Sequence, residues 1–426
     1  MHKLYFLVIC WLLVSPTLAQ DDVIRLTVDT SDHISEVSPY VYGVNYGPWS
    51  YVPVDWIDTI DTVGATFIRF PGGNWGDLNF IRDNHLRDLF FWAERMGNLE
   101  VSISVNLETG DPERAADLVR RVNIENDYGV TYWSIGNEPN LFADYSTEQH
   151  NRDWRAFAEA MLAVDPDIQF IGPDISQYQG DPTLDPKDDA GRLYLDEFLI
   201  ANGDLVDIVS VHRYPFPSRM AGPTATIDEV RLSTREWETI IPALNETVFE
   251  LTGEAKPIAV TEINSHWSNG VGFETANDSH YNAIWWADVL GQMIVGDVFL
   301  VNYFALQSDS TTGGYGLIGR FDARPTYYTY RMYQQFGTQL VAATSSDPDV
   351  SIFAAFDDDD KLTLMIINLA EDEKTIALDL GDFEAQSADH WLFDLSHNAD
   401  MLGEINLADA MTLSPQSITA LVITGE

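Results

Sequence analysis

A chain of 426 residues, 45% of them hydrophobic and 12% aromatic, can bury one large core and a smaller second one, which excludes an intrinsically disordered protein. It has 67 acidic and only 23 basic residues, which gives a formal net charge of −44. Such a surface repels nucleic acid and anionic membranes, so nucleic acid is excluded as a partner.

The first 19 residues have the pattern of a secretory signal peptide. Lys3 provides the positive start, residues 4–14 the apolar centre, and TLA at residues 17–19 a small-residue cleavage site. A membrane anchor is the alternative, but eleven apolar residues are short for a membrane span. We therefore expect a secreted protein, extracellular or periplasmic, with no membrane contact after cleavage. Cys10, the only cysteine, lies in this segment, so the mature chain would have no disulfide and no thiolate.

Residues 36–336 alternate between apolar strands and amphipathic helices, which predicts an α/β fold, a (β/α)8 TIM barrel. Asp111 before Pro112 predicts the start of one helix, and Trp154, Phe157 and Met161 mark the apolar face of the next. The eight barrel strands are expected at residues 41–46, 65–70, 100–106, 131–138, 169–174, 206–212, 257–262 and 298–306.

Residues 337–426 contain short strands separated by turns, which predicts a C-terminal all-β sandwich domain. Its strands are expected at 351–356, 362–368, 375–379 and 417–424. A strand at 23–29, within the N-terminal segment 20–35, is expected to join this domain. The acidic run 357–360 is interpreted as a hairpin turn, with a calcium site as the alternative.

Two glutamates are expected at the carboxyl ends of barrel strands, where α/β barrels keep their chemistry. YWSIGNEPN at residues 132–140 is an apolar run that ends in Glu138 and Pro139, and a proline cannot continue a strand ladder. PIAVTEIN at residues 257–264 delivers Glu262 in the same way. A pair of carboxyl groups suits hydrolysis of a glycosidic bond, with one as acid and base and the other as nucleophile. The alternative is that either glutamate is only a surface loop residue.

Further polar side chains are expected near these two. Asn137 could bind a sugar hydroxyl or simply form the turn before Pro139. Arg69, at the end of the second strand, could bind the nucleophile or form a salt bridge at the rim. His212 and Tyr214 follow the sixth strand; Tyr214 could donate to Glu262, and His212 could equally be a core histidine.

Other candidate features are a turn and three tryptophans. PGGN at residues 71–74 is a sharp turn that leaves room for a substrate. Trp49, Trp75 and Trp267 follow strand ends and could stack on sugars, with burial in the core as the alternative. The sequence contains no His-Glu-x-x-His, no glycine-rich phosphate loop after a strand and no Gly-x-Ser-x-Gly. We therefore expect no metal site, and no cofactor, since carboxyl groups and water suffice for the reaction.

The two motifs resemble those of the retaining glycoside hydrolases of clan A, whose acid and nucleophile follow strands four and seven. WSIGNEPN at 133–140 is similar to the acid/base motif of the clan, and VTEIN at 260–264 to its nucleophile motif. ISEVSPYVYG at 34–43 and RFPGGN at 69–74 resemble the α-L-arabinofuranosidase family, which implies a sugar contact for Asn74. Leu141 after NEPN is closer to the β-xylosidase family, and SPYVYGVN at 38–45 to a bacterial endoglucanase and xyloglucanase family. Ile263 stands where arabinofuranosidases often have tryptophan.

Together these features predict a secreted retaining glycoside hydrolase that acts on plant-type polysaccharides or oligosaccharides. The resemblance favours α-L-arabinofuranosidase or β-xylosidase activity. An endo-acting β-glucanase or xyloglucanase is one alternative, and a non-catalytic carbohydrate-binding barrel is another, although the latter needs no pair of carboxylates. The sequence leaves exo against endo action, the sugar and the oligomeric state open.

Overall fold

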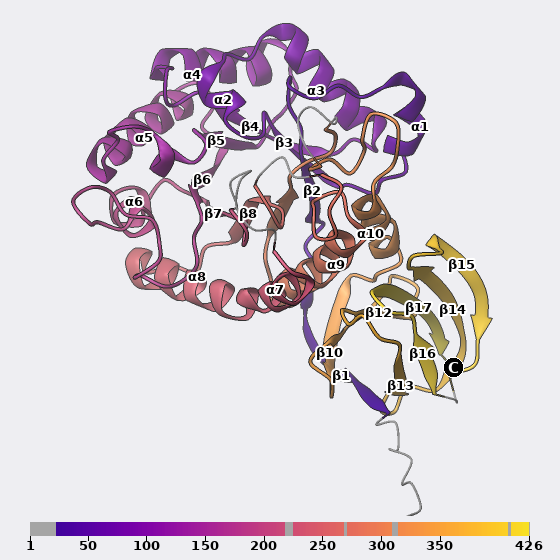
Figure 1. The fold of residues 1–426 in the computed structure, drawn as a ribbon. Helices are drawn as coiled ribbons and strands as arrows, with labels where there is room; N and C mark the ends of the chain where they lie inside the picture. Colours follow the sequence, from indigo (N-terminus) through magenta and orange to yellow (C-terminus); the bar gives the residue numbers. More distant parts are fainter. Residues whose placement is uncertain (1–22, 218–224, 268–270, 309–313, 408–409, 426) are drawn as a thin grey trace, which may run out of the picture.

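The computed structural model describes residues 23–217, 225–267, 271–308, 314–407 and 410–425. Two parts lie side by side, a barrel ringed by helices and a curled β-sheet formed by both ends of the described chain (Figure 1). The predicted signal peptide lies outside the described residues. Among the described residues, no helix has the length and apolar character needed to cross a membrane.

The barrel is closed and parallel, and all eight predicted strands are confirmed. Each strand is buried on both faces, one against the barrel interior and one against the helices, which is why each appears in the sequence as an apolar run. The strands are β2 (Tyr40–Asn45), β3 (Phe67–Phe70), β4 (Glu100–Val105), β5 (Tyr132–Ile135), β6 (Gln169–Ser176), β7 (Ile208–Arg213), β8 (Ile258–Ile263) and β9 (Leu300–Tyr303).

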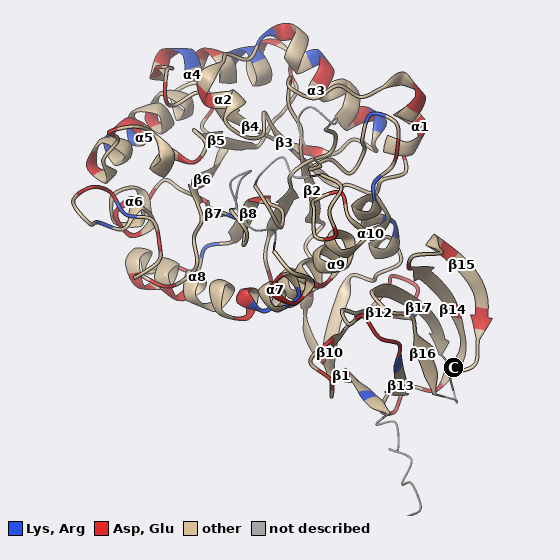
Figure 2. Ribbon diagram, viewed as in Figure 1, with Lys and Arg blue, Asp and Glu red and all other residues tan. Residues whose placement is uncertain are grey.

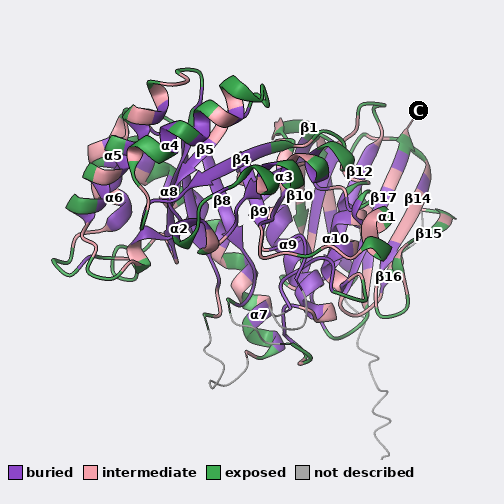
Figure 3. Ribbon diagram, turned by 90° about the horizontal axis from the view of Figure 1, so that it is seen from above, coloured by how far each residue is buried: buried purple, intermediate pink, exposed green. Residues whose placement is uncertain are grey.

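The helices surround this barrel with their apolar sides inward (Figure 3). The predicted start of α4 is confirmed, since the side chain of Asp111 accepts a hydrogen bond from the Arg114 N–H at 2.9 Å, with Pro112 in the first turn. The helices are α1 (Ile57–Ile60), α2 (Trp75–Leu78), α3 (Asp83–Arg95), α4 (Pro112–Val119), α5 (Thr147–Leu162), α6 (Tyr194–Asn202), α7 (Ile227–Ser233), α8 (Trp237–Thr252), α9 (His280–Val295) and α10 (Pro325–Tyr333).

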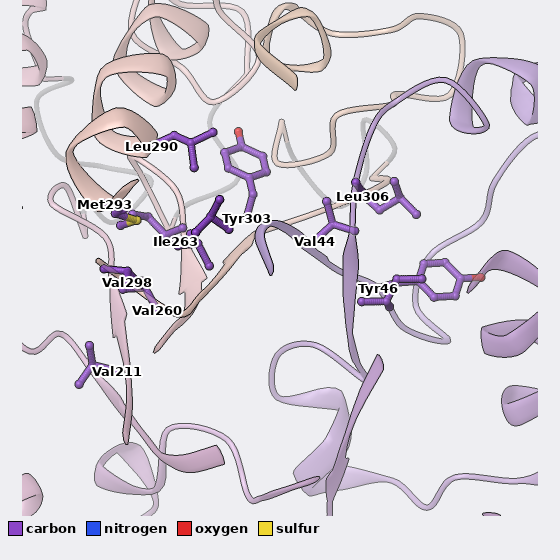
Figure 4. Packing of buried hydrophobic residues seen from close by; sticks show 14 of the residues in the cluster. Val44, Tyr46, Val211, Val260, Ile263, Leu290, Met293, Val298, Tyr303 and Leu306 are labelled. Atoms are coloured by element: carbon purple, nitrogen blue, oxygen red, sulfur yellow. The ribbon is translucent and has the colours of Figure 1, made fainter. Parts of the chain in front are cut away.

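Helix α9 lies between the barrel and the sheet and is apolar on almost every side. Figure 4 shows Leu290 and Met293 of α9 beside Ile263 and Tyr303 at the ends of β8 and β9. On its other side α9 contacts β11, β12 and β17 of the sheet. One apolar cluster therefore runs from the barrel wall through α9 into the sheet, and it holds the end of β8 in place.

The all-β part is confirmed, and hydrogen bonds join nine described strands into one sheet in the order β15-β14-β17-β12-β11-β10-β1-β13-β16. In β12, Leu364 and Ile366 face a cluster enclosed by the curl, while Met365 and Ile367 face the barrel side. The strands are β1 (Ile24–Glu36), β10 (Gln339–Ser345), β11 (Val350–Phe356), β12 (Leu362–Asn368), β13 (Lys374–Asp379), β14 (Ala385–Phe393), β15 (Asn398–Ile405), β16 (Met411–Leu413) and β17 (Ser417–Gly425).

The acidic run 357–360 forms the turn between β11 and β12. The N–H of Asp357 donates to the carbonyl of Lys361 at 3.0 Å, and the Oδ1 of Asp357 accepts from the N–H groups of Asp359 and Lys361. One of the four carboxylates is thus engaged in holding the hairpin, as the preferred interpretation of this segment predicts.

Acidic side chains outnumber basic ones over the outer helices of the barrel (Figure 2). A net charge of −44 destabilises the folded chain by self-repulsion. Salt shortens the range of this repulsion from about 30 Å at 0.01 M to about 3 Å at 1 M ionic strength. We therefore expect the melting temperature to rise by a few degrees between these concentrations of NaCl, measured by circular dichroism. Sorbitol of equal osmolality is the control, and a melting temperature that falls with salt would contradict this expectation.

Candidate active site

The chain turns away from the strand direction just before Glu138. Strand β5 ends at Ile135, earlier than the predicted end at residue 138, because Gly136 and Glu138 both have left-handed backbone, with φ of 82° and 51°. The N–H of Glu138 donates to the carbonyl of Asp174 at 3.2 Å, and Pro139 opens a short 3-10 helix. A left-handed conformation is uncommon for glutamate, so the surrounding contacts hold Glu138 in this position.

Glu262 reaches the same place from β8. Glu138 and Glu262 are 7% and 4% exposed, and a carboxylate oxygen of one lies within 4.8 Å of a carboxylate oxygen of the other. A separation of about 5 Å places two carboxyl groups on either side of one bond but leaves no room for a water molecule between carboxylate and sugar. The barrel thus brings together two side chains that stand 124 positions apart (262 − 138).

His212, the penultimate residue of β7, lies between the two glutamates. Its Nδ1 is 3.2 Å from Oε1 of Glu138 and 3.5 Å from Oε2 of Glu262. The imidazole is fully buried, and the contacts are to carboxylates of the site. His212 is therefore part of the polar cluster and not an isolated histidine of the apolar core.

Arg69 fills the centre of the barrel at the end of β3 and not its rim. Its Nη1 donates to Oε1 of Glu262 at 3.4 Å and to Oδ1 of Asn45 at 2.9 Å. Its Nη2 donates to Oδ1 of Asn137 at 2.7 Å and to Oδ2 of Asp174 at 3.1 Å. One guanidinium thereby orients the glutamate of β8 and the asparagine that precedes Glu138.

Two asparagines link the loops after β3 and β5. Asn137 donates from Nδ2 to Oδ1 of Asn74 at 2.9 Å, while its Oδ1 accepts from Arg69. An amide nitrogen carries two N–H groups, so the hydrogen bond to Asn74 uses one of the two. Asn74 itself lines the cavity above the glutamates.

Tyr214 donates from its hydroxyl to Oε2 of Glu262 at 3.1 Å. Burial, and then the charge of Glu262, raise the pKa of Tyr214 well above its ordinary value. The hydroxyl therefore keeps its proton, and Tyr214 is a permanent donor to the glutamate. The side chains of Arg69 and Tyr214 hold opposite oxygens of the Glu262 carboxylate.

A cavity of about 360 Å³ opens above the two carboxylates. Trp267 and Leu141, which are 38% and 52% exposed, form parts of its wall. The other lining residues are Gly73, Asn74, Glu138, Tyr214, Glu262, Phe304 and Tyr315. This volume accommodates a sugar ring, with an indole and an aliphatic side chain as apolar surfaces.

Of the three tryptophans considered from the sequence, only Trp267 lines this cavity. The Nε1 of Trp49 donates to the carbonyl of Gly72, and its ring stacks on Phe304 at 5.4 Å. The ring of Trp75 packs edge-on against His85. Trp49 and Trp75 are therefore half-buried packing residues, neither lining this cavity nor fully buried in the core.

His212 and Glu138 are a hydrogen-bonded pair between which one proton can pass. Burial works against protonation of His212, but the charge of Glu262 and the contacts with Asp174 and Glu138 outweigh it and raise the pKa of His212 to about 9. Burial also acts to raise the pKa of Glu138, but the hydrogen bond and charge of His212 prevail and lower it. These shifts favour protonated His212 beside ionised Glu138 at neutral pH, with Nδ1 of His212 3.2 Å from Oε1 of Glu138.

Glu262 responds to where that proton is. Burial and the charge of Glu138 raise the pKa of Glu262, against the opposing effects of His212, Arg69 and Tyr214. When the proton passes from His212 to Glu138, Glu262 loses both the repulsion of the Glu138 carboxylate and the attraction of the imidazolium. Arg69 and Tyr214 then favour the ionised form of Glu262, so the site can hold one protonated and one ionised glutamate.

Glu138, His212 and Glu262 are also, among the described residues, the group of acidic and imidazole side chains that lies close enough to hold a cation. A histidine that binds a metal ion must be neutral. Protonation of His212, which its raised pKa favours, competes with such binding. We therefore interpret the three side chains as a proton-sharing cluster.

Two buried residues of the site, Asn45 and Asp174, were not predicted. Both bind Arg69 and both are almost completely buried. Phe304 and Tyr315, which line the cavity, were not predicted either. The only sequence signal for Asp174 was its place near the end of a predicted strand, which many structural residues share.

Comparison with solved structures shows that the fold of this chain is similar to that of glycoside hydrolases. Those proteins are (β/α)8 barrels with an additional all-β domain. A family 44 xyloglucanase from Paenibacillus polymyxa has a TM-score of 0.72 at 16% identity, covering 94% of this chain and 99% of its own. An α-L-arabinofuranosidase from Thermotoga maritima, in complex with arabinose, has a TM-score of 0.72 at 16% identity, covering 95% and 100%. The predicted resemblance to clan A is thus confirmed at the level of fold.

Two curated relatives are similar in sequence. An exo-α-(1→6)-L-arabinofuranosidase of Bifidobacterium longum is 27% identical over 158 residues, which are 28% of this chain and 30% of that protein. Heparanase of Bos taurus is 24% identical over 282 residues, 63% of this chain and 48% of that protein. The matches thus span less than half of each relative. The chain matches no family model.

Proposed function

We propose that the protein is a retaining glycoside hydrolase in which Glu262 is the nucleophile and Glu138 the general acid and base. The observation that carries this proposal is the pair of buried carboxylates within 4.8 Å of each other, beneath a cavity with an exposed tryptophan. The fold shared with glycoside hydrolases and the sequence relationship to an arabinofuranosidase support it.

In the first step an oxygen of Glu262 attacks the anomeric carbon of the sugar. The bond from this carbon to the glycosidic oxygen breaks, and the leaving oxygen keeps the electron pair and takes the proton of Glu138. The proton on Nδ1 of His212 is within hydrogen-bonding distance of Glu138 and can supply it. The sugar is then an ester of Glu262.

In the second step a water molecule replaces the leaving group. Glu138, now ionised, removes a proton from the water, whose oxygen attacks the anomeric carbon, and the carboxylate of Glu262 leaves. Arg69 and Tyr214 stabilise the carboxylate as its charge returns. Each step inverts the anomeric carbon, so the product has the configuration of the substrate.

For the substrate we favour a plant-type pentoside, cleaved by α-L-arabinofuranosidase or β-xylosidase activity. The match to the arabinofuranosidase of Bifidobacterium longum supports this choice. The alternative is endo-acting hydrolysis of a β-glucan or xyloglucan, which the structural similarity to the Paenibacillus polymyxa xyloglucanase supports equally.

A substrate panel separates these activities. The mature protein and its Glu262→Ala variant would be assayed on aryl α-L-arabinofuranoside, aryl β-D-xyloside, xyloglucan, β-glucan and, because of the bovine relative, heparan sulfate. Release of pentose that is lost in the variant supports the favoured activity, and cleavage of the polymers alone supports the alternative. Sugar binding without hydrolysis anywhere in the panel would contradict the proposed function and favour a carbohydrate-binding barrel.

Tyr214→Phe tests the support of the nucleophile. The variant keeps the ring but loses the hydrogen bond to Glu262, and a hydrogen bond to a charged group contributes about 1.5–3 kcal/mol. We expect kcat to fall roughly 10- to 100-fold with a smaller change in KM, because the ionised carboxylate is needed in the chemical steps. Steady-state kinetics measures this, with Tyr145→Phe, distant from both glutamates in its contacts, as the control. Unchanged kcat in Tyr214→Phe would contradict a role for this donor.

We further propose that residues 1–19 direct secretion, that residues 36–336 form the catalytic domain and that segment 20–35 belongs with the sheet of residues 337–426. The pairing of β1 with β10 and β13 supports the last assignment. N-terminal sequencing of protein from the culture medium tests the first. A secreted chain that begins at Gln20 is expected, whereas retention of residues 1–19 in the cell would contradict it.

A further inference from the structure

A third carboxylate lies beneath the two glutamates. Asp174, on β6, is 1% exposed, and its Oδ2 accepts a hydrogen bond from Nη2 of Arg69 at 3.1 Å. Its Oδ1 accepts from the hydroxyls of Ser210 and Thr261, both at 2.5 Å. Strands β3, β7 and β8 thus supply the contacts that fix one buried charge on β6.

Asp174 also faces His212 from the side opposite the glutamates. Its Oδ1 is 3.7 Å from Nε2 of His212, whose Nδ1 lies 3.2 Å from Glu138. The imidazole therefore lies between carboxylates, one beneath it and two above. A ring in this position is stabilised in its protonated form and in a single orientation.

The main chain of Asp174 adds a direct connection to Glu138. Asp174 has left-handed backbone with φ of 57°, and the register of β6 against β7 shifts between Pro173 and Ile175. This irregularity points the carbonyl of Asp174 at the N–H of Glu138, 3.2 Å away. A left-handed backbone is unfavourable for an aspartate inside a strand, so the surrounding contacts must hold it. Here the carbonyl of this aspartate is hydrogen-bonded to Glu138, the proposed acid.

We propose that Asp174 is a positioning residue of the reaction: through Arg69, His212 and the main chain of Glu138 it holds both glutamates and keeps the shared proton on the His212–Glu138 pair. This inference rests on the proposed function. Asp174 touches neither the cavity nor a substrate bound there, since it does not line the cavity.

The charge of Asp174 explains how it keeps the proton on the His212–Glu138 pair. Around His212 stand the carboxylates of Asp174, Glu138 and Glu262 and the guanidinium of Arg69, with the Tyr214 hydroxyl on Glu262. Three negative and two positive groups, counting protonated His212, leave one negative charge (2 − 3 = −1). Removal of the charge of Asp174 makes this cluster neutral, so the shared proton is lost at a lower pH.

Asp174→Asn tests the inference, because it removes the charge and keeps the size. We expect kcat to fall about 100-fold, as when a supporting group is misplaced. We also expect the alkaline limb of the pH–rate profile to move to lower pH by about one to three units, the usual effect of one charge at this distance. A purely structural residue would not move this limb.

Asp188→Asn is the matched control. Asp188 is also a buried aspartate that accepts from an arginine and from a hydroxyl, those of Arg192 and Thr147, but none of these residues lines the cavity. It is expected to lose stability and to keep the wild-type pH profile. A wild-type profile in Asp174→Asn, or the same shift in Asp188→Asn, would overturn the inference while leaving the proposed function intact.

The titration of His212 by NMR gives a readout that needs no activity. Its signal is assigned by its loss in His212→Gln. The wild-type ring is expected to stay protonated at pH 7, and to titrate at lower pH in Asp174→Asn. If the wild type hydrolyses no glycoside, the proposed function fails, and this titration still decides whether Asp174 controls His212. Should Asp174→Asn not fold, a neutral His212 at pH 7 in the wild type would overturn the inference, and a protonated one would support it.

Discussion

Replacement of Glu262 by alanine is expected to lower kcat by about four orders of magnitude or more, comparable with loss of the nucleophile in other hydrolases. The variant cannot form the sugar ester, because Glu138 can protonate the leaving oxygen but no carboxylate remains to attack the anomeric carbon. Arg69 and Tyr214 lose their shared partner, but both keep other surroundings, so the fold should persist. Hydrolysis of an activated aryl glycoside measures the effect, with circular dichroism as the check on folding.

Added azide is expected to restore turnover in Glu262→Ala and so to test the prediction by a gain of activity. The small anion fits the space left by the carboxylate and attacks the anomeric carbon from the side of Glu262, with Glu138 still able to protonate the leaving oxygen. One displacement inverts the carbon, so Glu262→Ala should form a glycosyl azide of inverted configuration. A retained azide, or turnover near the wild-type rate without azide, would contradict the role of Glu262.

Replacement of Glu138 by alanine is expected to have an effect that depends on the leaving group. General acid catalysis contributes about 10² to 10⁴ in rate, so hydrolysis of a natural glycoside should slow about 10³-fold. A dinitrophenyl glycoside needs no proton on its leaving oxygen, and its first step should be nearly unaffected. The ester on Glu262 should then accumulate, because no base activates water, and a burst of dinitrophenol should precede slow turnover.

Azide separates Glu138 from Glu262. In Glu138→Ala it attacks the sugar ester on Glu262 without needing a base, and two displacements return the configuration of the substrate. The retained glycosyl azide is therefore expected from this variant and the inverted one from Glu262→Ala. Equal losses on natural and dinitrophenyl substrates, with no burst, would contradict the role of Glu138.

The barrel could be predicted from the sequence because its strands are buried on both faces. Runs such as residues 298–306 contain few polar residues, and loops and helices separate the runs. The ends of the strands were harder to predict from the sequence. Strand β5 ends at Ile135 because of left-handed backbone at Gly136 and Glu138, whereas the sequence suggested that Pro139 would end it.

The sheet was predicted only in part. Strands β11, β12, β13 and β17 have runs of apolar residues and were expected. Strand β15 lies at one edge and β14 beside it; many of their side chains are exposed, and both strands lack such runs. Strand β10 is exposed at several positions and β16 has three residues. Their weak apolar pattern follows from the exposure of their side chains and not from edge positions alone, since β10 and β14 pair with a strand on both sides while β15 and β16 end the sheet.

The residues of the site also divide into those that could be predicted from the sequence and those that could not. Glu138 and Glu262 could be selected because each follows an apolar run and because two carboxyl groups suggest one reaction. Asp174 could not, since its significance depends on contacts with Arg69 and His212 from other strands. No local pattern distinguishes Trp267, which lines the cavity, from Trp49, which packs against Phe304.

The most direct test of the central claim is the configuration of the first product, followed by proton NMR at the anomeric position during hydrolysis. Carboxylate oxygens within 4.8 Å of each other leave no room for a water molecule beside Glu262, so the reaction must pass through a sugar ester. The account predicts that the anomer of the substrate appears first and mutarotates later. Initial formation of the opposite anomer would contradict the assignment of Glu262 as nucleophile.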